Sequence, residues 1–170
     1  MAGQIDINTL QALTAGRRGT GTNRLKFFSD LFPYLLVPVL VYNFAALFAD
    51  GGAPDGVPVL RAVMDAPGMI VPMLSGVGLE VTWGDLLVIF ATIFLFVEVV
   101  KSTSTSHTAI INHILSMVLF VICLIEFLLF ASFATGTFFI LTCMVLVDAL
   151  AGMVVSIMSA RRDFGVEGMN

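Results

Sequence analysis

A chain of 170 residues with 58% hydrophobic and 12% charged residues has little polar surface to present to water. Soluble domains carry about 25% charged residues, so this composition and a mean hydropathy of +1.01 exclude a water-soluble protein. The formal net charge of −4 does not indicate a nucleic-acid partner, because the acids are scattered and the bases lie beside the apolar segments.

Residues 1–28 form a polar arm that carries Arg17, Arg18, Arg24 and Lys26. The arm lacks the hydrophobic core of a signal peptide, so we expect the first span to be an uncleaved anchor. A weak apolar stripe in the arm leaves two interpretations open. It is a frayed tail, or it is a short helix on the inner membrane surface.

Four long apolar segments follow, and they predict an all-α integral membrane protein, a compact bundle of four transmembrane helices over residues 29–160. An apolar helix of about 20 residues matches the ~30 Å hydrocarbon core of a bilayer. A re-entrant hairpin is the alternative for the second and shortest segment. The predicted spans are about residues 31–49, 83–102, 108–131 and 137–160.

The first span contains two prolines, Pro33 near its start and Pro38 in its interior. Proline has no backbone N–H, so Pro38 cannot donate a hydrogen bond to the carbonyl of Tyr34. We therefore expect a bend in this helix at Pro38.

Residues 50–82 form a long loop that is rich in glycine and proline but partly apolar. Its apolar stretches are interrupted at Pro67 and Pro72. We expect an interfacial or partly re-entrant element that caps the outer mouth of the bundle. Trp83 then marks the outer interface, where tryptophan is enriched.

The distribution of lysine and arginine predicts the orientation. Of the eight bases, only Arg61 falls in the outer loop. By the positive-inside rule the other side is cytoplasmic, so both termini, including the tail 161–170, are expected inside. The expected location is the cytoplasmic (inner) membrane of a bacterium.

Three carboxylates, Glu98, Glu126 and Asp148, lie within the predicted spans. Charged groups in a bilayer are costly and usually face a partner, a water-filled cavity or another subunit. Together with His113 they form a ladder in depth, as a proton or cation path would require. Glu126 and His113 point about 140° apart on their helix, so one narrow pore in a monomer cannot face both. The alternative is that protonated carboxyls hydrogen-bond between helices and hold them together.

Two further patterns concern packing at the cytoplasmic side. Glu98 and Lys101 are three residues apart, so we expect a structural pair at the cytoplasmic edge. Small residues follow Asp148 at intervals of four and predict a face that packs closely against protein, either an internal helix or another chain. These small residues are Gly152, Ser156 and Ala160.

The sequence contains no recognised enzyme or metal motif. There is no G-x-S-x-G, HExxH or Walker loop. His107 and His113 do not have the spacing of a strong metal site, and Cys123 and Cys143 fall inside predicted spans as apolar fillers. We expect no metal and no cofactor.

The layout of one span, a loop and three closely spaced spans resembles the phosphate-starvation-inducible E family of small four-span proteins. The resemblance rests on Glu98-Val-Val-Lys101 and the histidine that follows, and it covers about half of the chain. Glu126 departs from it, because a base is expected there. The resemblance implies the four-span layout and no particular activity.

Two functions from different classes remain open, and a membrane enzyme is the third. The first is a small ion- or proton-linked channel or transporter, assembled as a homo-oligomer because four short helices rarely enclose a selective path. The second is a non-catalytic accessory or assembly subunit of a larger membrane complex. The lipid bilayer is the partner that all three share.

Overall fold

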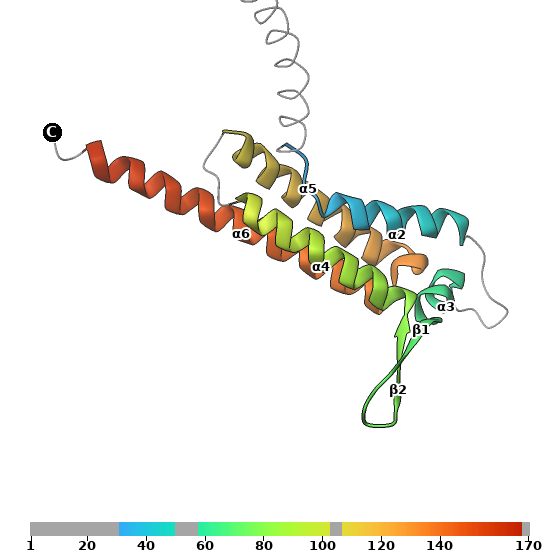
Figure 1. The fold of residues 1–170 in the computed structure, drawn as a ribbon. Helices are drawn as coiled ribbons and strands as arrows, with labels where there is room; N and C mark the ends of the chain where they lie inside the picture. The colour runs from blue at the N-terminus through green and yellow to red at the C-terminus, as the bar shows by residue number, and fades with distance from the viewer. Residues whose placement is uncertain (1–30, 50–57, 103–106, 168–170) are drawn as a thin grey trace, which may run out of the picture.

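The computed structural model describes residues 31–49, 58–102 and 107–167, and it is mostly helical (77%). Four helices run beside one another in the described part (Figure 1). The chain alternates in direction, so α2 and α5 end where α4 and α6 begin. We call this the hairpin end, and we call the opposite end, where α4 stops, the Lys101 end. The helices are α2 (Leu36–Phe48), α4 (Trp83–Ser102), α5 (His107–Leu129) and α6 (Gly136–Glu167).

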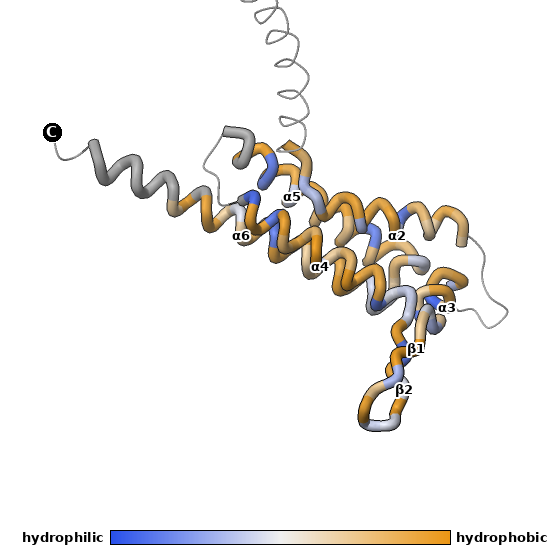
Figure 2. The backbone as a smooth tube through the Cα atoms, viewed as in Figure 1, coloured by the Kyte–Doolittle hydropathy of each residue, from blue (hydrophilic) through white to orange (hydrophobic). Residues whose placement is uncertain are grey.

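Three helices of the described part, α4, α5 and α6, are long and apolar enough to cross a bilayer. Apolar residues predominate along all three (Figure 2). They indicate an integral membrane protein. The fourth predicted span is not confirmed, because α2 has 13 residues. At 1.5 Å per residue it is about 20 Å long, shorter than the ~30 Å hydrocarbon core.

The start of α2 differs from the sequence-based expectation. The helix begins at Leu36, so Pro38 lies in its first turn and not in its interior. The N–H groups of a first turn have no intrahelical acceptor, so proline is tolerated there. The carbonyl of Tyr34 instead accepts the N–H of Val37 at 3.0 Å. The expected bend at Pro38 is therefore replaced by a helix start.

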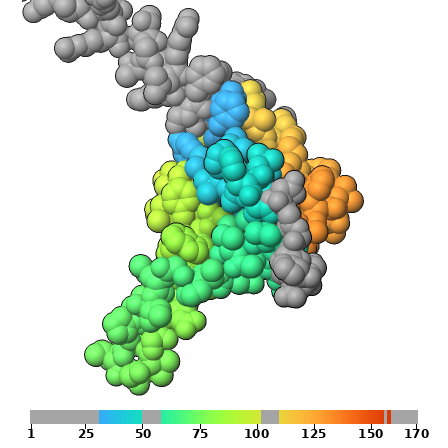
Figure 3. Space-filling model, turned by 90° about the vertical axis from the view of Figure 1, so that its right-hand side faces the viewer, coloured from blue at the N-terminus to red at the C-terminus, as the bar shows by residue number. Residues whose placement is uncertain are grey.

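The predicted outer loop contains regular structure, including the one departure from an all-α fold among the described residues. A short helix, α3 (Val59–Asp65), precedes two antiparallel strands, β1 (Pro67–Pro72) and β2 (Gly78–Thr82). Helix α3 packs against α4 and the short 3₁₀ helix η1 (Ala131–Phe133). The strands project to one side of the bundle end (Figures 1 and 3). The hairpin does not cover the bundle as expected for a cap.

Helix α6 packs against both α5 and α4 in the core. Near the hairpin end, the ring of Tyr42 from α2 lies 4.7 Å from the ring of Phe138 and 5.6 Å from that of Phe133. Its hydroxyl donates to the carbonyl of Ser132 at 3.0 Å and contacts the hydroxyl of Thr135 at 2.6 Å. Tyr42 thereby fixes α2 to the turn between α5 and α6.

Candidate functional site

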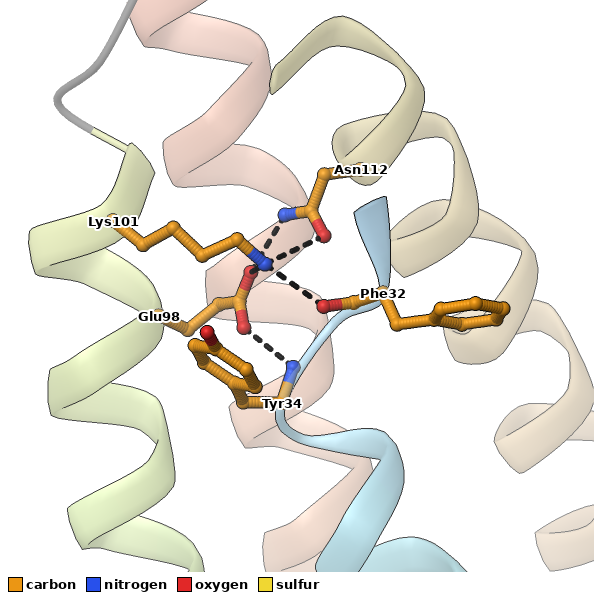
Figure 4. A network of polar contacts seen from close by, with 5 residues as sticks. All are labelled: Phe32, Tyr34, Glu98, Lys101 and Asn112. Atoms are coloured by element: carbon orange, nitrogen blue, oxygen red, sulfur yellow. Dashed lines mark hydrogen bonds and ion pairs between the residues drawn. The ribbon is translucent and has the colours of Figure 1, made fainter. Parts of the chain in front are cut away.

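A network of polar contacts joins α4, α5 and the segment before α2 at the Lys101 end (Figure 4). Glu98 of α4 is 0% exposed. Its Oε1 accepts hydrogen bonds from Asn112 Nδ2 at 2.6 Å and from Lys101 Nζ at 3.4 Å, and its Oε2 accepts the backbone N–H of Tyr34. Lys101 Nζ also donates to the Phe32 carbonyl at 2.8 Å and to Asn112 Oδ1 at 3.1 Å.

This network explains why a carboxylate is stable inside an apolar bundle. Both oxygens of Glu98 accept hydrogen bonds, and a cation compensates its charge. Lys101 also lies 4.3 Å from the ring centre of Tyr34, within range of a cation–π contact. The network ties the segment before α2 to α4 and α5, which makes it a structural anchor.

A second polar group lies deeper, on the facing sides of α5 and α6. It consists of His113 and Ser116 on α5 and Asp148 on α6, and all three are buried. Asn112 of the first group and His113 of the second are consecutive residues on α5, so the two polar groups are neighbours.

Several atoms of this second group lack a hydrogen-bond partner among the described residues. They are both ring nitrogens of His113, the hydroxyl oxygen of Ser116 and Oδ2 of Asp148. The Ser116 hydroxyl lies beside the carboxyl of Asp148, but neither the hydroxyl oxygen nor Oδ2 of Asp148 has a hydrogen bond in the described structure. Buried polar atoms are nearly always paired, so unpaired ones need an explanation such as water, an ion or a functional role.

Gly152 lies directly against this second group. A Cβ atom at Gly152 would overlap the imidazole ring of His113. At this position the small-residue stripe therefore faces α5 of the same chain. The side chains of Ser156 and Ala160 lie outside the described part, so the stripe beyond Gly152 stays a prediction.

Glu126 is not part of either group. It lies ten residues after Ser116 on α5, about 15 Å farther along the helix. Glu126 is half-buried, and its Oε2 accepts a hydrogen bond from Asn43 Nδ2 of α2 at 3.3 Å. Buried apolar side chains, among them Leu119 and Cys123, occupy the same stretch of the bundle. The predicted ladder is thus separated into a buried cluster and one distant carboxylate.

The described residues contain no group of three histidine, cysteine or acidic side chains that could hold a metal ion. Cys123 is buried and Cys143 is exposed, and both are free thiols. The side chain of His107 lies outside the described part. The arrangement offers groups for proton exchange and hydrogen bonding. The Ser116 hydroxyl belongs to the same cluster as His113, but no hydrogen bond joins them in the described structure.

Sequence reasoning missed two members of these groups. Asn112 and Ser116 are ordinary polar residues in an apolar helix, and only their burial reveals their position. Their separation of four residues along α5 places them on one helical face, which is the available sequence signal. Comparison with protein-family models, with curated proteins and with solved structures finds no match for this chain. The function must therefore be argued from the site.

Proposed function

We propose that this chain is an ion- or proton-linked membrane transporter in which Asp148 and His113 bind a proton or a small monovalent cation. The observation that carries the proposal is the set of unpaired, buried polar atoms on His113, Ser116 and Asp148. Ionisable residues in a membrane-spanning helix are costly, and they often mark ion or proton pathways. Carboxyl and imidazole groups both exchange protons, and carboxylate and hydroxyl oxygens also bind hard cations.

Glu98 has a supporting role in this proposal. Its oxygens are occupied by Asn112, Lys101 and the backbone of Tyr34, so it has little capacity left for a transported ion. It lies on the Lys101 side of the buried cluster, where its partner Asn112 adjoins His113 on α5. We infer that Glu98 and Lys101 block the site at the Lys101 end and hold α4 and α5 in place beside it.

The proposed path runs between copies of the chain in a homo-oligomer, and α5 and α6 must separate to open the buried cluster to it. Between the buried cluster and the hairpin end, the bundle interior holds apolar side chains such as Leu119, Cys123 and Val145. This packing favours a path between copies over a pore through one chain. We further propose that the protein resides in a bacterial inner membrane with both termini in the cytoplasm and the hairpin end outside.

The test is proton flux into liposomes that contain the full-length protein and an entrapped pH-sensitive dye. We expect Asp148→Asn to reduce flux to the level of empty liposomes, because the amide of asparagine neither gains nor loses a proton near neutral pH. The matched control is Glu80→Gln, which removes one exposed carboxylate from β2. Wild-type flux equal to that of empty liposomes with both H⁺ and Na⁺ gradients would refute the proposal, as would unchanged flux in Asp148→Asn.

An accessory or assembly subunit is the second candidate, and one feature of α2 favours it. A shallow groove of about 550 Å³ lies on α2 and is lined by Val37, Leu40, Val41, Phe44 and Leu47 with Asn43. Such a groove can receive an apolar helix of a larger complex. Native mass spectrometry of protein extracted from its own membrane separates the two candidates. A discrete homo-oligomer supports transport, whereas foreign subunits in fixed ratio support the accessory role.

A further inference from the structure

A second groove lies at the hairpin end between α2, α5 and η1, and it has a volume of about 400 Å³. Ala46 and Leu47 of α2 form one wall, and Phe133 of η1 contributes to another. The hydroxyl of Tyr42 donates to the carbonyl of Ser132 beside the groove. The groove is therefore built on a packed part of the fold.

Glu126 brings a carboxylate to this apolar groove. Its Oε2 accepts one hydrogen bond, from Asn43, whose amide also donates to the Val39 carbonyl at 3.2 Å. The ion pairs of the described residues join Arg61 to Asp65 and Lys101 to Glu98, and none involves Glu126. A carboxylate has about four acceptor positions, so most of the capacity of Glu126 is free for a ligand.

The position of Glu126 along α5 indicates where that ligand lies. Glu126 is three residues from the helix end at Leu129, about 5 Å along the axis. If α5 crosses the bilayer over residues 110–129, this is the edge of the hydrocarbon core, next to the lipid headgroups. Leu47 and Phe130 line the groove and are 76% and 54% exposed, so its rim is apolar. An amphiphile at this place would meet apolar contacts beside a negative charge.

We propose that the Glu126 groove binds the headgroup of a phospholipid with a primary ammonium, such as phosphatidylethanolamine. A primary ammonium has three N–H donors for the free acceptor positions of Glu126, and such charge-assisted hydrogen bonds are strong. A quaternary choline has the same charge but no N–H donor. The inference does not rest on the proposed transport, because Glu126 lies about 15 Å from Ser116 along α5.

The test is lipid retention by the full-length protein in native mass spectrometry. The probes are phosphatidylethanolamine and phosphatidylcholine with identical acyl chains. We expect the wild type to prefer phosphatidylethanolamine about tenfold, because a hydrogen bond to a charged group has that magnitude. Glu126→Gln should reduce the preference severalfold, because a neutral amide oxygen accepts a weaker hydrogen bond from the ammonium than a carboxylate does. Glu80→Gln, which removes an exposed carboxylate at the same end, should retain it.

A ligand series tests the same idea without any substitution. Successive N-methylation of phosphatidylethanolamine removes one N–H donor at a time at constant charge, so wild-type retention should fall stepwise. Equal retention of all members of the series would refute the proposal. An undiminished preference in Glu126→Gln would also refute it, because the recognition would then come from another part of the protein. Neither outcome affects the flux test of Asp148.

Discussion

Glu98 and Lys101 depend on each other, because Glu98 is fully buried and the side chain of Lys101 is only 14% exposed. We predict that Lys101→Met lowers the free energy of unfolding by about 3–5 kcal/mol, since it leaves a buried carboxylate without its cation. The double variant Lys101→Met/Glu98→Gln should recover most of the loss. The measurement is denaturant titration in mixed micelles. A double variant as unstable as the single one would contradict a paired role.

Gly152 and Gly136 offer a matched comparison within α6. A Cβ atom at Gly152 would overlap His113, whereas one at Gly136 meets nothing within 4 Å. We predict that Gly152→Ala destabilises the protein by about 1–3 kcal/mol through overpacking, and that Gly136→Ala has little effect. Thermal unfolding of both variants in one detergent checks this. Equal stability of the two variants would show that α5 and α6 do not approach as closely as described.

At the residue scale, the contacts that could be predicted were those between residues close in the sequence. The spacing of Glu98 and Lys101 predicts their contact, and their charged atoms lie 3.4 Å apart. The partners Asn112 and Tyr34 are 14 and 64 positions from Glu98, so no helical spacing indicates them. Glu126 was predictable as a costly carboxylate, but its separation from Asp148 depends on how the helices pack.

At the level of elements, the hairpin of β1 and β2 depends on one glycine. The amide of Gly76 donates to the carbonyl of Met73, and the amide of Met73 donates to the carbonyl of Val77. Gly76 has a φ of 82°, which is costly for other residues. We predict that Gly76→Ala destabilises the hairpin by about 1–2 kcal/mol. The measurement is hydrogen exchange of the hairpin amides, which should be faster in Gly76→Ala than in the wild type. Ser75→Ala is the control and should exchange like the wild type.

The composition and exposure of β1 explain why the hairpin was not predicted. Strands with one buried face alternate apolar and polar residues, but every residue of β1 is exposed, and apolar side chains occupy both of its faces. The three residues 74–76 between the hydrogen-bonded Met73 and Val77 end in the left-handed Gly76, and this glycine was the available signal. The long helices were predictable because apolar length alone specifies them. The start of α2 was not, because two prolines permit either a bend or a helix start.

At the scale of the whole molecule, the direction of α2 bears on how often the chain crosses the membrane. The segment before α2 is bound at the Lys101 end, where Phe32 accepts a hydrogen bond from Lys101. The last turns of α2 lie near the hairpin end, where Asn43 contacts Glu126. Although α2 is short, this segment extends from one end of the bundle towards the other. The chain therefore enters the bundle at the end where α4 stops.

This direction of the chain predicts which positions lie on each side of the membrane. Single cysteines at Thr20, Arg61 and Glu167, in a background without Cys123 and Cys143, should react differently with a membrane-impermeant maleimide on intact cells. We expect only Arg61→Cys to be labelled, because α3 lies at the hairpin end and the positive-inside rule places the other two positions inside. Labelling of all three after permeabilisation is the control. If Thr20→Cys were labelled on intact cells while Glu167→Cys stayed protected, the chain would cross three times and α2 would not span.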